Sequence, residues 1–135
     1  MACLDTTILI DLAARNARRK EHAVRKIEEL AKKGQSLATT RFNVAELYVG
    51  VARSRCPQED ERALATLLSE FEILEFNDAA ARIFGAITAF LQQIGRPIGD
   101  MDVLIAATAM SCGHSLITRD SRHFRHVPTL IVEDY

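Results

Sequence analysis

Four acidic side chains stand among apolar neighbours in this chain of 135 residues: Asp5, Glu46, Asp102 and Asp120. Asp5 ends the opening run MACL, Glu46 interrupts FNVAELYVGVA, Asp102 opens DVLIAATAM, and Asp120 closely follows SLIT. Two carboxylates about 5 Å apart repel by roughly 3 kcal/mol at an effective dielectric constant near 20. If folding brings the four together, protonation or a bound cation must relieve the repulsion. Hard oxygen ligands of this kind suit Mg²⁺ or Mn²⁺.

The elements that position these side chains follow from an alternation of short apolar runs with longer helical stretches. We expect strands at Ala2–Leu4, Ser36–Ala38, Glu72–Phe76, Ser115–Thr118 and Thr129–Val132. We expect helices near Thr7–Ala14, Arg18–Lys33, Arg41–Ser54, Gln58–Glu70, Asp78–Gln93 and Asp100–Cys112. This order predicts an α/β fold with a mostly parallel sheet of about five strands, in one domain over residues 1–135. Ligands bind beyond the carboxyl ends of such strands, where Asp5 and Asp120 fall.

The helix around Glu46 carries a polar stripe. Asn43, Glu46, Gly50 and Arg53 recur at spacings of three and four residues, and nearly everything else from Phe42 to Ala52 is apolar. A helix that is apolar on most sides is mainly buried, so the stripe could face a cleft. It could equally face solvent, with Glu46 contacting an arginine, and periodicity alone leaves both readings open.

Asp100 and Asp102 belong to one helix start but do not share a helix face. We expect Asp100 to be the N-cap and Asp102 to project from the first turn. Both acids could also do no more than complement the helix dipole. Asp120, in TRDSRHF, could form an Asx-turn or cap a short helix through Phe124.

Several polar residues near the acidic ones could have structural roles. Thr6 and Thr7 could cap the first helix or supply a hydroxyl to the site, and the cap is the favoured interpretation. Asp11 lies within that helix and is expected to be structural or peripheral. His123, near Asp120, is a candidate phosphate contact.

Composition excludes several classes of protein. The net charge is −1, so bulk electrostatics identifies no partner, although basic residues crowd the segments 15–33 and 119–126. The three cysteines form no CxxC pair, which argues against a disulfide scaffold or structural zinc. No apolar run approaches the roughly 18 residues of a membrane span, and the N-terminus lacks a signal-peptide layout, so we expect a cytoplasmic protein. Serine-hydrolase, P-loop and dinucleotide motifs are missing.

Taken together, the motifs resemble the PIN-domain family, specifically the VapC-type ribonuclease toxins of toxin–antitoxin pairs. The resemblance rests on CLDTTILIDL, FNVAELYVGV, IGDMDVLIAATAM and LITRDSRHF, which occur in register across essentially the whole chain. It implies a three-layer α/β/α fold. It maps the family's acidic site onto Asp5, Glu46, Asp102 and Asp120, with Asp100 and Thr6 as accessory residues. Thr7 departs from the family pattern, in which Asn is common.

The resemblance also implies an activity, a cofactor and partners. The activity is Mg²⁺- or Mn²⁺-dependent endonucleolytic hydrolysis of RNA, in which metal activates water and stabilises charge at the phosphate. Asp5 and Asp102 would be the main ligands, with Glu46 and Asp120 completing the set. The partners would be an RNA substrate, a VapB-type antitoxin and a second copy of the chain in a homodimer. The residues that contact RNA are not readable from the sequence.

Two other functions compete with this one. The first is a PIN-fold interaction module without catalysis, which the complete acidic set argues against. The second is a receiver-like or phosphatase domain with Asp5 as phosphoacceptor. It lacks support because Thr-Thr follows Asp5 in place of a second acid, and no suitable Lys follows a late strand.

Overall fold

The computed structural model describes residues 1–135 and contains five strands and seven helices. The strands are β1 (Ala2–Leu4), β2 (Leu37–Thr40), β3 (Glu72–Leu74), β4 (Ser115–Ile117) and β5 (Val132–Glu133). The helices are α1 (Thr6–Leu12), α2 (Ala17–Lys32), α3 (Arg41–Ala52), α4 (Pro57–Leu68), α5 (Asp78–Gln93), α6 (Asp100–Ser111) and α7 (Ser121–Phe124). All strand pairs are parallel, in the order β3-β2-β1-β4-β5, which confirms the predicted fold class.

Four of the five strands differ from their predicted bounds. β3 ends at Leu74, not Phe76, and β4 ends at Ile117, not Thr118. β2 runs on to Thr40 because Thr39 and Thr40 pair in register with β3. The last strand was predicted at Thr129–Val132 but begins only at Val132. Thr129 has a positive φ of 62°, which is incompatible with an extended strand.

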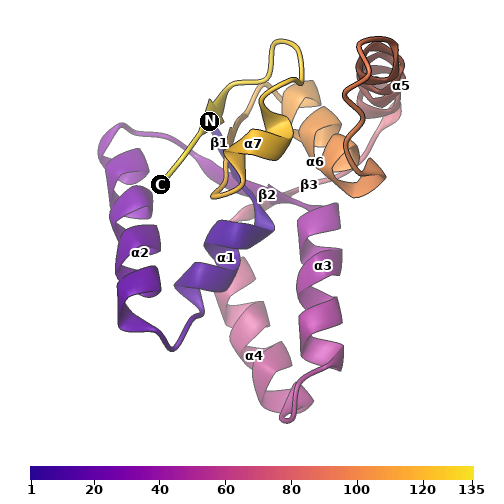
Figure 1. The fold of residues 1–135 in the computed structure, drawn as a ribbon. Coiled ribbons are helices and arrows are strands. Elements are labelled where there is room, and N and C mark those ends of the chain that lie inside the picture. Colours follow the sequence, from indigo (N-terminus) through magenta and orange to yellow (C-terminus); the bar gives the residue numbers. More distant parts are fainter.

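Helices lie on both sides of the sheet (Figure 1), and each side has its own apolar cluster. Cys3 and Leu116 face one cluster, which contains side chains of α5 and α6, whereas Leu4 and Ile117 face the other, built with α1 and α2. Neighbouring residues of β1 and β4 thus point to opposite faces, and the central strands are buried on both, as their continuous apolar sequence predicts. No helix is both long enough and apolar enough to cross a membrane.

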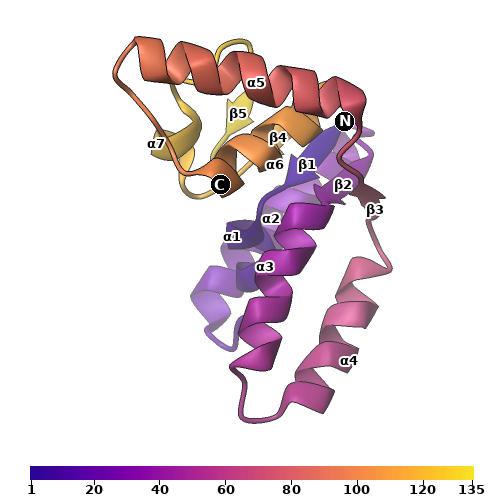
Figure 2. The same cartoon turned by 90° about the vertical axis from the view of Figure 1, so that its right-hand side faces the viewer.

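The sheet order reverses direction at its centre. Successive strands β1, β2 and β3 proceed toward one edge, and β4 then pairs with the other side of β1. Helices α3 and α4 extend as a pair away from the sheet, and α1 lies next to them (Figure 2). The carboxyl ends of β1 and β4 therefore open at a topological switch point, the usual place for a ligand site in open α/β sheets.

A buried carboxylate on α1 joins distant parts of the chain. Asp11 accepts hydrogen bonds from Arg19 Nε at 2.8 Å, from Arg119 Nη1 at 2.8 Å and from the Tyr135 hydroxyl at 2.7 Å. Burial by itself would raise the pKa of Asp11. The hydrogen bonds from Tyr135 and Arg19, with the charge of Arg119, outweigh burial and hold the pKa below its ordinary value. Of the two roles expected for Asp11, structural or peripheral, its burial and its three partners support the structural one.

Asp11 should contribute to the resistance of the fold to acid. Because its folded-state pKa is depressed, its stabilisation is complete above the unfolded pKa, near 3.9, and is lost as the pH falls through the folded value. The Tm of the protein should therefore fall more steeply than that of Asp11→Asn as the pH drops below about 4. Thermal unfolding followed by circular dichroism between neutral pH and pH 3 measures this difference. Parallel curves for the two proteins would contradict it.

Candidate functional site

Asp5 is the residue around which the candidate site is built. It follows β1 directly and is buried, with 6% of its surface exposed. Its carboxylate accepts hydrogen bonds from Asn43 Nδ2 at 3.0 Å, Thr118 Oγ1 at 2.8 Å and Thr7 Oγ1 at 3.3 Å. All three donors are neutral, so the negative charge of Asp5 lies in the protein interior without a basic partner.

Glu46 is joined to Asp5 through two intermediate side chains. The Thr6 hydroxyl donates to Glu46 Oε1 at 2.7 Å, and Asn43 Nδ2 donates to Thr6 Oγ1 at 3.0 Å as well as to Asp5. The favoured interpretation of Thr6 and Thr7 as helix caps is wrong. Asp5 occupies the N-cap position of α1, and both hydroxyls bond to carboxylates of the site instead.

Only half of the predicted polar stripe on α3 faces the site. Asn43 is fully buried and Glu46 is half-buried, whereas Gly50 and Arg53 are exposed. The expectation of a mainly buried helix fails in its second half, where Val49 is also exposed. The reason is that α3 extends past the sheet, so the core covers only its first turns (Figure 2).

Asp102 projects from the first turn of α6, as predicted, and is half-buried. Its Oδ2 atom lies 3.5 Å from His123 Nδ1 of α7, an interaction that is ionic only if His123 is protonated. The prediction that Asp100 is the N-cap is wrong. The cap position is Gly99, whose extended backbone (φ −60°, ψ 147°) places Asp100 as the first helical residue. Asp100 is exposed and lines a separate cavity of about 110 Å³ near α5.

Asp120 stands between β4 and α7, at the N-cap position of the short helix but without a side-chain cap hydrogen bond. Its backbone N–H donates to Thr118 Oγ1 at 3.0 Å, and the same hydroxyl donates to Asp5. Asp120 is exposed, and its side chain makes neither a hydrogen bond nor an ion pair. It is free to take up a ligand.

The four carboxylates influence one another electrostatically. Burial raises the pKa of Glu46, and the charges of Asp5 and Asp102 add to that rise against the Thr6 hydrogen bond. Burial also raises the pKa of Asp102, with further increases from Asp5 and Asp120 and an opposing effect from His123. We refer to Asp5, Glu46, Asp102 and Asp120 as the acidic cluster. Asp100 is not among the charges that act on it.

The chemistry of the acidic cluster fits a hard divalent cation. None of its carboxylates is paired with Lys or Arg, and the only ionisable partner is His123. Asp11, by contrast, has two arginine partners. The arrangement is not a closed coordination shell, because no three acidic, His or Cys side chains are placed to share one ion. Glu46 and Asp5 instead accept hydrogen bonds from Thr6 and Thr118, and Asp102 lies beside His123.

The sequence indicated Thr6 as an accessory residue but did not assign two other neutral residues, Asn43 and Thr118, to the site. Asn43 was recognised only as part of a stripe, and Thr118 was not singled out at all. The signal for Thr118 was available, since it directly follows β4, the strand that pairs with β1, and therefore lies beside Asp5. The signal for Asn43 was its position three residues after Thr40, with which it forms a capping box.

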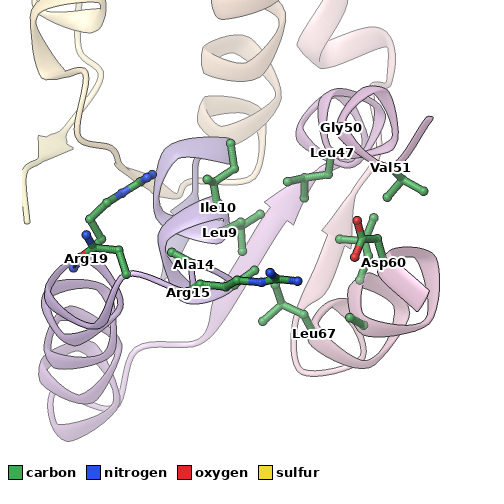
Figure 3. Close-up of a pocket in the computed structure, with 14 residues that line it drawn as sticks. Leu9, Ile10, Ala14, Arg15, Arg19, Leu47, Gly50, Val51, Asp60 and Leu67 are labelled. Carbon is green, nitrogen blue, oxygen red and sulfur yellow. Dashed lines mark hydrogen bonds between the residues drawn. The ribbon is translucent and has the colours of Figure 1, made fainter. Parts of the chain in front are cut away.

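The largest cavity lies outside the acidic cluster. It is a groove of about 500 Å³ between α1, α3 and α4, and contains none of the four carboxylates. Figure 3 shows apolar side chains along the groove, with arginines on the α1–α2 side and one acid on α4. Its labelled apolar members include Leu9, Ile10, Leu47, Val51 and Leu67. Because α1 and α3 also carry residues of the site, the groove and the acidic cluster share two helices.

Comparison with known proteins is consistent with this geometry. The model of the PIN domain family matches residues 2–130. Ribonuclease VapC2 of Haemophilus influenzae is 33% identical over 135 residues, covering 98% of this chain and 96% of the relative. The tRNA(fMet)-specific endonuclease VapC of Shigella flexneri is 31% identical over 99 residues, covering 73% and 75%. The crystal structure of VapBC2 from Rickettsia felis bound to a promoter DNA fragment contains a similar fold, with a TM-score of 0.89, 28% identity and coverage of 99% and 98%.

Proposed function

The chain belongs to the PIN-domain family as a VapC-type ribonuclease toxin of a VapBC toxin–antitoxin system, and we propose that its acidic cluster is the metal-dependent active site. The observation that supports this most is the buried charge of Asp5, which only neutral groups contact. Family membership displaces the receiver-like alternative. The homodimer and the cytoplasmic location stay predictions.

The proposed site consists of metal ligands and of neutral residues that orient them. Asp5 and Asp102 would hold Mg²⁺ or Mn²⁺, with Glu46 and Asp120 completing the ligand set. The bound ion would lower the pKa of a water molecule and stabilise charge on the scissile phosphate. Asn43 and Thr118 fix the Asp5 carboxylate through their hydrogen bonds. Thr6 fixes Glu46 in the same way, so the protein supplies a preorganised set of oxygen ligands.

The first test of this function is a cleavage assay with a defined RNA. The tRNA(fMet) molecule is the first substrate to examine, because the Shigella flexneri relative is named for it. We expect the purified chain to cut RNA in Mg²⁺ or Mn²⁺, to lose activity in EDTA and to regain it when Mn²⁺ exceeds the chelator. Equal cleavage with and without EDTA would contradict the metal-dependent mechanism. No RNA cleavage by a folded, metal-binding chain would favour the interaction module.

A second part of the proposal concerns the antitoxin. Solved relatives of this chain are VapBC complexes, and we propose that the groove between α1, α3 and α4 receives an apolar helical segment of a VapB-type antitoxin. The groove has a mainly apolar lining, which suits a protein segment better than RNA. Arg15 and Arg19 at one side and Asp60 at the other would orient the segment by charge.

Filling the groove should weaken antitoxin binding without affecting catalysis. A Cβ atom at Gly50 would meet no heavy atom within 4 Å, so Gly50→Arg should fold and place a bulky charge in the groove. We expect at least a tenfold loss of affinity for the proposed VapB-type antitoxin, measured by calorimetry, with RNA cleavage unchanged.

The matched control is Gly85→Arg on α5, where the added side chain also enters open space but lies outside the groove. It should bind the antitoxin as tightly as the unsubstituted protein. If Gly50→Arg kept full antitoxin affinity and instead changed the oligomeric state or the affinity for RNA, the groove would serve a second copy or the substrate.

A further inference from the structure

Asp11 lies outside the acidic cluster, yet it is among the most heavily bonded carboxylates in the protein. Its side chain is 3% exposed and receives hydrogen bonds from three side chains that come from different parts of the sequence. Arg119 donates from Nη1 to both of its oxygens, at 3.0 and 2.8 Å. Both oxygens accept from the same nitrogen, a bifurcated, charge-assisted contact that fixes the position of the Arg119 side chain.

Arg119 belongs to the segment that carries Asp120. The two flanking residues of this segment are also anchored: Thr118 Oγ1 donates to Asp5, and the Asp120 backbone N–H donates to Thr118. The Arg119 backbone N–H donates to Thr7 Oγ1 at 3.0 Å. The segment therefore touches the acidic cluster on one side, while the Arg119 side chain ties it to α1 on the other.

The side chain of Asp120 has no bonding partner that could hold it in place. The position of the Asp120 carboxylate therefore depends on the backbone of residues 118–120. Within these three residues, the Arg119–Asp11 contact is the only ion pair. On this geometry, we propose that Asp11 is a positioning residue that holds Asp120 in the acidic cluster by anchoring Arg119. The inference rests on the proposed function of Asp120.

Tyr135 and Arg19 complete the anchor. The Tyr135 hydroxyl donates to Asp11 Oδ2, the oxygen that also accepts from Arg119, and Arg19 donates to Oδ1. With donors on both oxygens, the carboxylate cannot rotate without breaking several hydrogen bonds. An amide in its place offers one oxygen only and no charge, so Asp11→Asn must lose the ion pair and one of the two contacts with Arg119 Nη1.

A double-mutant cycle with Asp120→Asn separates positioning from general stabilisation. We expect Asp11→Asn alone to lower the RNA cleavage rate and the affinity for Mn²⁺ by about tenfold each, as for other residues that orient metal ligands. In the Asp120→Asn background, where the positioned carboxylate is already lost, Asp11→Asn should change either quantity by less than about twofold. The Mn²⁺ affinity is measured by calorimetry, independently of activity.

Two further variants keep the test decisive. Arg119→Gln breaks the same ion pair at the partner whose side chain is half-exposed, so it should fold even if Asp11→Asn folds poorly. It should repeat the effects of Asp11→Asn on cleavage and on Mn²⁺ affinity. Arg82→Gln removes an arginine that pairs with Asp78 on α5, away from Asp11, the acidic cluster and the groove, and should leave cleavage and Mn²⁺ affinity within about twofold of the unsubstituted protein.

The outcomes distinguish the two levels of the proposal. Equal losses from Asp11→Asn in both backgrounds, or equal losses from Arg82→Gln and Arg119→Gln, would overturn the positioning role. If Asp120→Asn alone left cleavage and Mn²⁺ affinity unchanged, the assignment of Asp120 to the active site would be wrong, and the positioning role would fall with it.

Discussion

Replacing Asp5 with Asn should lower the rate of RNA cleavage by about 100-fold to 1,000-fold while the fold stays intact. A metal ion in such a site contributes several kcal/mol to transition-state stabilisation, and each 1.36 kcal/mol is a factor of ten in rate. Asp5 is the most buried ligand candidate and is electrostatically coupled to both Glu46 and Asp102. Loss of its charge should therefore weaken the binding of any cation to the whole cluster.

The fold should tolerate this change because the neighbours of Asp5 can adjust. Thr7 and Thr118 donate to one of its oxygens, and their hydroxyls can turn to accept a hydrogen bond from the new amide. A single-turnover cleavage assay, with circular dichroism of the same sample, measures both effects. Asp78→Asn is the matched control, since Asp78 is an exposed acid that contacts only Arg82 on α5. Full activity of Asp5→Asn would exclude Asp5 from the active site.

Replacing Asn43 with Ala should reduce both stability and activity. The buried amide donates to Asp5 and Thr6 and accepts from Thr40, so its removal leaves buried groups without partners. Unsatisfied buried groups and a lost helix cap together cost about 3 kcal/mol in the free energy of unfolding, or roughly a 10 °C lower Tm for a chain of this size. Because Asp5 also loses its only amide donor, we expect cleavage to fall by about tenfold.

Asn77→Ala provides the comparison for this variant. Asn77 also caps a helix, accepting from the Ala80 backbone N–H at 2.9 Å, but it lies away from the site. Its loss should cost about 1 kcal/mol and leave the cleavage rate unchanged. Thermal unfolding and the cleavage assay compare the stability and the activity of the two variants. If Asn43→Ala were no less stable or less active than Asn77→Ala, the hydrogen bonds of Asn43 would have no special role.

The sequence predicted the parts of the structure that depend on local pattern. Alternating elements and buried strands are sufficient to place Asp5 and Asp120 at strand ends on one side of a parallel sheet. Glu46 and Asp102 were predicted from their apolar surroundings and from the family resemblance. The structure shows that all four are electrostatically coupled, and their role as ligands stays a prediction.

What the sequence could not show are the contacts between residues far apart in the chain. Thr118 and Asp5 are separated by 113 positions, and Tyr135 and Asp11 by 124. No local signal distinguishes a threonine that caps a helix from one that orients a carboxylate, as the error over Thr6 illustrates. The exposure of the second half of α3 was hidden for the same reason, because it depends on where the sheet ends.

The most direct test of the acidic cluster is a crystal structure of the chain grown with Mn²⁺, with anomalous diffraction recorded at the manganese edge. We predict an anomalous peak between the carboxylates of Asp5 and Asp102, with metal–oxygen distances of about 2.0–2.3 Å and the His123–Asp102 contact broken. A structure that binds Mn²⁺ elsewhere, while the cluster keeps its present hydrogen bonds and the protein cleaves RNA, would contradict the assignment of the active site.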